Sequence, residues 1–331
     1  MRHFELGWQR ALLAAGAVLT WTLAQPASGE PTVLSSTSDE WADGGSQACL
    51  ECHDERSEVP VLPILATAHG VKGDARTPMG SAHECQSCHG ASAAHAARRE
   101  KGEERPSVAV VFGPDTPVEP QNEACLTCHR GGPRMNWTGS AHDVNQLRCT
   151  TCHQVHAKQD LVRETDIRPN VTFKQNTTEV CFGCHQEQRA LAYRAYSHPV
   201  MEGKMSCTSC HNPHGSPTDH MLAQPTLNET CYQCHAEKRG PFLWEHAPAR
   251  EDCTFCHTPH GSNHPGMLTQ RTPLLCQQCH VAQFHPSTAY AAPDPNATPP
   301  RLDIHLVGRA CLNCHSEVHG SNHPSGPRFT R

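Results

Sequence analysis

The sequence is poor in the residues from which a protein core is built. Aromatic residues make up 5% and hydrophobic residues 37% of the 331-residue chain. Beyond the N-terminus no stretch approaches the ~20 apolar residues that a membrane-spanning helix needs, and no segment shows a convincing strand pattern. A chain of this composition does not build an ordinary core for its length. Something other than its own side chains must therefore fill the interior.

The chain also has no excess of positive charge. Its formal net charge is −6 with histidine neutral, which argues against nucleic acid as a partner, because that role needs a basic surface. The compositional anomaly is instead histidine, with 26 residues, beside 20 cysteines.

All 20 cysteines belong to Cys-x-x-Cys-His motifs, the attachment signature of a c-type haem, and the motif occurs ten times. A disulfide framework, a zinc ribbon or a thioredoxin-like site does not explain a histidine after every second cysteine. We therefore predict ten covalently bound haem c groups, which would also supply the missing core. The cysteines are Cys49/Cys52, Cys85/Cys88, Cys125/Cys128, Cys149/Cys152, Cys181/Cys184, Cys207/Cys210, Cys231/Cys234, Cys253/Cys256, Cys276/Cys279 and Cys311/Cys314. The histidines of the motifs, each the proximal iron ligand of its own haem, are His53, His89, His129, His153, His185, His211, His235, His257, His280 and His315.

The spacing of the motifs indicates five two-haem units, starting near residues 49, 125, 181, 231 and 276. The second motif of each unit is closely followed by a further histidine, and another histidine usually lies between the two motifs. Such a histidine cannot easily turn back onto its own iron, but it can reach a neighbouring one. This rule nominates nine distal ligands: His69, His95, His142, His156, His198, His214, His246, His260 and His319.

The tenth distal ligand has two candidates. His305 lies shortly before Cys311, as His142 does before its cysteine, whereas His285 in Phe-His-Pro-Ser echoes Ser-His-Pro at His198. The remaining histidines, His83, His220, His264 and His323, are expected to be solvated loop residues.

Two histidines on each iron would fill both axial positions. Metal catalysis needs an exchangeable coordination site, so this ligand set predicts electron transfer and no enzyme activity. It also predicts lower reduction potentials than a His/Met set would give.

Residues 1–29 are predicted to be a secretory signal, with Arg2 and Arg10 before a short apolar run and small residues at the cleavage site. Residues 30–331 would then form the decahaem domain, exported to a Gram-negative periplasm and without a membrane span of its own. Within it we expect helices near 122–129 and 228–238 and surface loops at 98–122 and 286–300, because 27 prolines and 23 glycines interrupt other periodicity.

Beyond the ten motifs, several stretches resemble the MtrA/DmsE family of decahaem cytochromes. They are Ala-Arg-Thr-Pro-Met at 75–79, residues 238–248 around His246, residues 316–324 around His319, and the last-but-one motif followed by Phe-His-Pro-Ser at 284–287. The resemblance covers essentially the whole mature chain, and it favours His285 over His305. It implies an elongated multihaem cytochrome c with little regular structure, in which short α-helices and loops wrap round a linear chain of ten haems. It also implies an outer-membrane β-barrel porin as a partner, with periplasmic and extracellular multihaem cytochromes or minerals at the two ends.

The function expected from this resemblance is electron transfer across the outer membrane, for metal reduction or Fe(II) oxidation. A soluble periplasmic shuttle to a terminal reductase is the alternative, and it would need no barrel. A multihaem enzyme is disfavoured because none of the ten motifs replaces its histidine with lysine. A haem store is disfavoured by the regular pairing of ligands.

Overall fold

A computed structural model describes residues 40–57, 60–156, 177–280 and 311–330. By its internal contacts the chain separates into Met1–Ser35 and Ser36–Arg331, and every described residue belongs to the second unit. The predictions for the signal at 1–29, the loop at 286–300, His285 and His305 lie outside the described residues.

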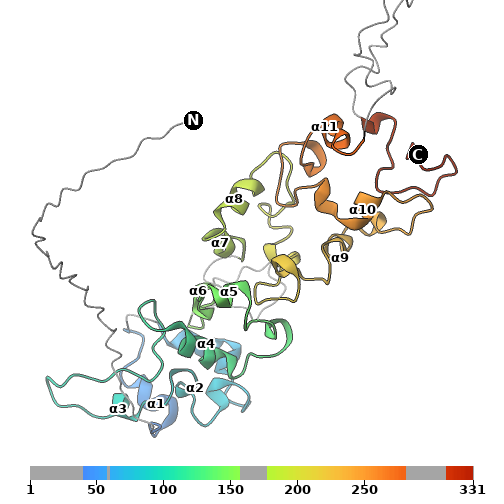
Figure 1. Cartoon of the computed structure of the whole chain (residues 1–331). Coiled ribbons are helices and arrows are strands. Elements are labelled where there is room, and N and C mark those ends of the chain that lie inside the picture. The colour runs from blue at the N-terminus through green and yellow to red at the C-terminus, as the bar shows by residue number, and fades with distance from the viewer. Residues whose placement is uncertain (1–39, 58–59, 157–176, 281–310, 331) are drawn as a thin grey trace, which may run out of the picture. The chain divides into compact units, whose positions relative to one another are not determined.

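The described chain consists of short helices joined by loops (Figure 1), and the longest helix has nine residues. Its only β-type pairings are four isolated bridges, so the prediction of little regular structure is confirmed. No helix in these residues is both long and apolar enough to cross a membrane. The α-helices are α1 (Gly45–Leu50), α2 (Gln86–His89), α3 (Ala93–Ala96), α4 (Val118–Leu126), α5 (Ala141–Val144), α6 (Cys149–Cys152), α7 (Thr177–Phe182), α8 (Gln186–Ala192), α9 (Leu227–Tyr232), α10 (Ala247–Glu251) and α11 (Thr272–Gln277). Single 3-10 turns lie at Leu62–Ala66, Ala68–Gly70, Pro78–Gly80, Gly132–Arg134, Cys207–Ser209, Asp219–Met221, Ala236–Lys238, Cys253–Phe255, Pro265–Met267 and Cys311–Asn313.

Each Cys-x-x-Cys-His motif includes part of an α-helix or a 3-10 turn. The first motif of each unit begins in the last turn of an α-helix, namely α1, α4, α7, α9 or α11. In all ten motifs the backbone N–H of the histidine donates to the carbonyl of the first cysteine, at 2.9–3.2 Å. A helical turn places side chains three residues apart on the same face, so both thiols of a motif can reach one haem.

Two helix boundaries differ from the prediction. α4 begins at Val118, inside the predicted loop at 98–122, because a proline in the first helical turn removes no hydrogen bond and Pro120 is tolerated there. α9 is capped by Thr226, whose hydroxyl accepts from Glu229 N–H, and it ends at Tyr232; the predicted helix at 228–238 is thus two separate pieces. Asn122 and Asn228, the first residues of the two predicted helices, are buried, and their side chains bond to the carbonyls of Leu147 and Arg250.

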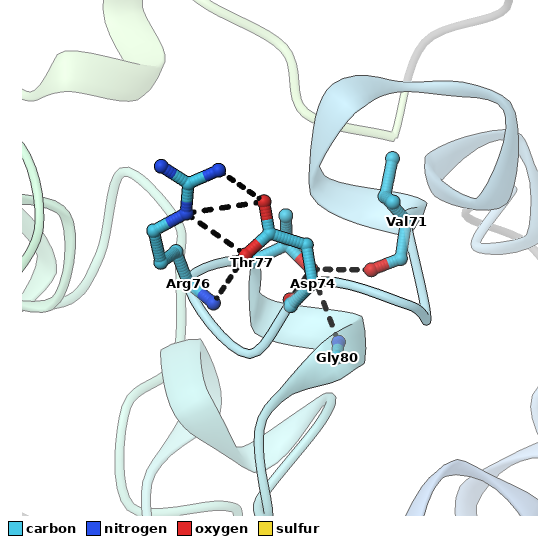
Figure 2. A network of polar contacts seen from close by, with 5 residues as sticks. All are labelled: Val71, Asp74, Arg76, Thr77 and Gly80. Atoms are coloured by element: carbon cyan, nitrogen blue, oxygen red, sulfur yellow. Dashed lines mark hydrogen bonds and ion pairs between the residues drawn. The ribbon is translucent and has the colours of Figure 1, made fainter.

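A compact loop at 71–80 connects His69 to the second motif (Figure 2). The Thr77 hydroxyl lies 2.5 Å from the carbonyl oxygen of Val71 and 2.9 Å from that of Asp74, and it accepts from Gly80 N–H at 3.1 Å. A Cβ at Gly80 would lie 2.1 Å from the Asp74 carbonyl oxygen, so only glycine closes the loop. The loop therefore fixes the spacing between His69 and the cysteines that follow.

The described residues contain almost no core of their own. Their buried hydrophobic side chains are Met79, Trp137, Phe182 and Ala192, against ten buried polar residues. Burial of apolar area is the main driving force of folding, and these four side chains supply little of it. The interior must be completed by a group that the polypeptide holds.

We therefore expect the chain made without haem attachment to be unfolded. Cofactor binding and folding are coupled when the polypeptide cannot form its sites alone. Far-ultraviolet circular dichroism and limited proteolysis of chain made in a host without haem ligation would show little helix and rapid cleavage. A cooperative thermal transition in the haem-free chain would contradict this expectation.

Candidate haem sites

The two motifs of each unit meet through their first cysteines. Hydrogen bonding between the two thiols lowers the pKa of Cys49, Cys207 and Cys231 to about 7, while the pKa of each partner thiol is raised. These contacts pair the motifs one with two, three with four, and so on to nine with ten. The contacting thiols are Cys49–Cys85, Cys125–Cys149, Cys181–Cys207, Cys231–Cys253 and Cys276–Cys311.

Successive units also meet through cysteines. The second cysteine of each even-numbered motif, up to the eighth, lies close enough to the next motif for their thiols to interact electrostatically. Every motif thus lies beside the motifs that precede and follow it in the sequence. The interacting pairs are Cys88–Cys128, Cys152–Cys181, Cys210–Cys231 and Cys256–Cys279.

The cysteines differ in exposure, and none of the 20 is fully buried. The first cysteine of every motif is half-buried, whereas the second cysteine of six motifs is exposed. The exposed cysteines are Cys52, Cys128, Cys184, Cys234, Cys279 and Cys314.

The position of each motif relative to its sequence neighbours accounts for this difference in exposure. First cysteines are covered by the other motif of their unit, and second cysteines such as Cys88 and Cys210 are partly covered by the next unit. Cys314 of the tenth motif is exposed. The five other exposed thiols all close the first motif of a unit, at the end of its helical turn. Haem attachment at these cysteines stays a prediction.

Nine motif histidines each face one further histidine, with ring centroids 5.9–6.4 Å apart. Two metal–imidazole bonds of about 2 Å each, plus about 1 Å from nitrogen to ring centre on both sides, give about 6 Å. Each pair therefore leaves room for one metal ion between its rings. The pairs are His53–His95, His69–His129, His89–His156, His142–His185, His153–His214, His198–His235, His211–His260, His246–His280 and His257–His319.

Backbone carbonyls orient many of these rings. A carbonyl oxygen only accepts, so a ring whose Nδ1 bonds to one carries its proton there and keeps the lone pair on Nε2 free for a metal. This holds for His89 to Val110 (3.2 Å), His95 to Pro106 (2.7 Å), His142 to Pro213 (2.7 Å), His156 to Val61 (3.1 Å), His198 to Pro259 (2.8 Å), His211 to His220 (2.8 Å), His257 to Gly266 (2.8 Å) and His315 to Arg328 (2.5 Å).

Burial keeps several rings in the neutral form that binds metal. It is the largest cause of the lowered pKa of His214, about 4, to which the nearby His153 and Arg134 also contribute. Burial likewise lowers the pKa of His69, His89, His129, His260 and His319. The spacing, the ring orientation and the neutral state all fit an iron held between two imidazoles.

The structure thus brings all nine nominated distal histidines to motif histidines. His315 is described, but the two candidates for its partner, His285 and His305, are not. Among the four spare histidines, His83 is not simply solvated, because its ring stacks on Trp41 at 3.7 Å. His220 and His323 act through their backbone carbonyls, which accept from His211 and from the Trp244 indole.

The pairing exchanges histidines between neighbouring units, which spacing alone did not reveal. A histidine between two motifs faces the first motif of the next unit, as His198 faces His235. A histidine that closely follows a second motif faces the second motif of the preceding unit, as His260 faces His211. Among the nine described pairs, one lies within a single unit: His95 faces His53 in the first unit. A unit therefore needs its neighbours to complete its sites.

Two buried asparagines hold the motifs of a unit together. Asn228 Nδ2 donates to the Arg250 carbonyl at 2.8 Å, and its Oδ1 accepts from Cys253 N–H at 3.0 Å. Asn122 does the same with Leu147 and Cys149, at 2.9 and 2.8 Å. The shared Asn-Glu-x-Cys before these motifs was the sequence signal for this role.

Replacing Asn228 with alanine should lower the thermal stability of the holoprotein. Buried partners left without a hydrogen bond cost about 1–3 kcal/mol, and three backbone groups bond to this side chain. Asn145→Ala is the matched control, since Asn145 is exposed and bonds only one carbonyl in the described structure. Equal melting temperatures for the two variants would show that Asn228 does not hold the unit together.

The comparisons with known proteins agree with this site. A doubled CXXCH motif matches residues 198–240 and 246–285, and a model of cytochrome c-type NrfB-like proteins matches residues 85–174. The multiheme cytochrome MtrA of Shewanella baltica is 44% identical over 287 residues, which are 87% of this chain and 81% of that protein. The chain belongs to the MtrA family. Two proteins named cytochrome c-type protein NrfB, from Haemophilus influenzae and Escherichia coli, are 32% and 25% identical over 158 and 191 residues, covering 44% and 54% of this chain and 66% and 89% of their own lengths.

Membership of the MtrA family confirms the resemblance read from the sequence. The chain is a multihaem c-type cytochrome that binds haem c and transfers electrons.

Proposed function

We propose that this cytochrome holds ten haem c groups and carries electrons along them across the outer membrane, inside a β-barrel porin. The observation that carries the proposal is the order of the motifs: each lies beside its sequence neighbours, from Cys49 to Cys311. Sites arranged in this way form one unbranched row.

Nine of the ten irons would be held by the histidine pairs described above, with the motif histidine proximal and its partner distal. The tenth, at His315, would take His285 as its distal ligand, with His305 as the alternative. Bound haem iron supplies one-electron chemistry by alternating between Fe(II) and Fe(III). With an imidazole on each side, the chain leaves no position for a substrate, so we propose an electron carrier and no enzyme.

The membrane location is supported by the family resemblance and by the character of the chain. The short helices and loops of the described residues expose polar backbone groups, which hydrocarbon does not accommodate. A surrounding β-barrel would separate them from lipid. Periplasmic and extracellular multihaem cytochromes, or minerals, would meet the two ends of the row, and their potentials would decide the direction of flow.

The test is purification of the native complex from outer membranes in mild detergent. A β-barrel recovered in a one-to-one ratio with the haem-staining chain is expected. Recovery of the cytochrome alone in the periplasmic fraction, with full electron transfer to a soluble reductase, would overturn the proposal in favour of the periplasmic shuttle.

A further inference from the structure

Two loops from neighbouring units dock on each other through backbone groups. The loop at 196–198 belongs to the third unit and the loop at 259–262 to the fourth. Tyr196 and Ser262 exchange two backbone hydrogen bonds, at 3.0 and 2.8 Å. His198 Nδ1 donates to the Pro259 carbonyl at 2.8 Å, and Ser262 is buried. We call this contact the joint.

Gly261 lies at the tightest point of the joint. Its φ of +131° is a conformation that side chains disfavour. A Cβ built there would lie 2.1 Å from the Leu191 carbonyl oxygen and 3.2 Å from the Ser197 Cβ. The clash is with backbone, so no rotamer change can relieve it. A glycine here is thus required by the close approach of the 259–262 loop to the end of α8 and to Ser197.

The joint presents two histidines to two different motifs. His198 faces His235 of the seventh motif, and His260 faces His211 of the sixth motif, at 6.3 and 6.0 Å between ring centroids. These two motifs are consecutive in the row, since the Cys210 and Cys231 thiols interact. The two loops of the joint therefore each supply one histidine to the two motifs that meet at this unit boundary.

The same arrangement recurs at two other unit boundaries. His142 Nδ1 donates to the Pro213 carbonyl, and a Cβ at Gly215 (φ +99°) would lie 2.1 Å from the Asn136 carbonyl oxygen. At the last boundary Trp244 and Ser321 exchange two backbone hydrogen bonds of 2.9 Å. There a Cβ at Gly320 (φ +131°) would lie 2.2 Å from the Phe242 ring.

We propose that Gly261 is a positioning residue for two haems at once, because it holds the distal ligands of the sixth and seventh motifs in one rigid contact. This rests on the ligand assignment of the proposed function. If the loops separate, His198 loses the carbonyl that orients it, and His260 moves with the same loop. A partner on Nδ1 fixes the ring and strengthens the nitrogen that faces the metal. One backbone contact therefore sets the coordination on both sides of the unit boundary.

The test compares Gly261→Ala with Gly203→Ala in the holoprotein. Gly203 also has a positive φ, +70°, but no atom lies within 4 Å of its Cβ position, so the control places alanine at a positive φ without the clash. Intact mass counts the haems, and electron paramagnetic resonance with redox titration counts those whose ligands change. In Gly261→Ala we expect ten haems still attached, with a changed low-spin signal and potential for two of them. Gly203→Ala should match the wild type.

Several outcomes would overturn the inference. A change at one haem alone, at none, or spread evenly over all ten would show that the joint does not position a pair. A lower melting temperature without a two-haem change would show a purely structural role. A wild-type protein that lacks ten low-spin, six-coordinate haems would instead contradict the ligand assignment, so the two failures are distinguishable.

If Gly261→Ala does not fold, Gly320→Ala tests whether a glycine at such a contact positions two haems. Its clash is with a side chain, which can be removed. We expect Gly320→Ala to alter two haems, those at motifs eight and nine, and the added Phe242→Ala to reverse part of the change. Phe242→Ala alone is the control. Identical spectra for Gly320→Ala with and without Phe242 would contradict the proposed clash, and a single altered haem would contradict the pairing.

Discussion

Replacing His260 with methionine should raise the reduction potential of one haem by roughly 0.1–0.3 V, part of the about 0.8 V range that axial ligands span. Methionine in place of histidine stabilises the reduced iron. His260 faces His211, so the haem at the sixth motif is the one expected to change. A redox titration followed by visible absorbance should show one component of the ten shifted upward, with all haems still attached.

Identifying the haem that gives the shifted component shows whether His260 serves a haem of the preceding unit or a haem of its own unit. His260 lies four residues from the eighth motif's cysteine in the sequence, yet its ring faces the sixth. The shifted component should therefore disappear when Cys207 and Cys210 are also replaced, and it should persist when Cys253 and Cys256 are replaced. If the shifted component persisted without Cys207 and Cys210 and disappeared without Cys253 and Cys256, the exchange of histidines between units would be contradicted.

His220→Ala is the matched control for His260→Met. His220 contributes its backbone carbonyl to His211 and is not among the paired rings of the described structure. Alanine keeps that carbonyl, so spectrum, haem content and potentials should equal those of the wild type. A raised potential in His220→Ala would show that its side chain binds iron.

Replacing both Cys207 and Cys210 with alanine should remove one haem and block electron flow through the row. The sixth motif lies between the fifth and the seventh, through Cys207 with Cys181 and through Cys210 with Cys231. In liposomes that contain the cytochrome and the proposed barrel partner, electron flow from an enclosed reductant to an external acceptor should fall close to the rate without cytochrome.

The same block is expected when Cys149 and Cys152 of the fourth motif are replaced, because every interior site of a single row is needed. Intact mass should report nine haems in each variant, which confirms that the rest of the chain has matured. Flow near the wild-type rate with nine haems would show a branched arrangement and contradict the row.

The exchange of histidines also explains why this chain folds as it does. The described residues have few buried apolar side chains and gain little from hydrophobic burial within a unit. Under the proposed ligation, histidines supplied from the neighbouring unit would tie successive segments together in place of that missing core. We expect the units to mature cooperatively.

The sequence by itself determined the attachment chemistry of this protein. Cysteine and histidine at fixed spacing form a local signal, because one helical turn suffices to place both thiols and the proximal imidazole. The low content of aromatic residues likewise predicted an interior that the chain does not fill. The nine distal candidates could also be nominated from their positions beside the motifs, since they are near in sequence to some iron.

Only the tertiary structure decided which histidine faces which motif, in what order the motifs lie and which thiols are exposed. Those relations join residues far apart along the chain, such as His142 with His185 and His257 with His319. Spacing could not show them, because a loop between two motifs can turn toward either neighbour. Which neighbour a loop turns toward is set by its contacts with other loops. A glycine such as Gly261 lets two backbones approach, and backbone carbonyls orient the histidine rings. These contacts depend on the positions of distant segments, which exist only once the chain has folded.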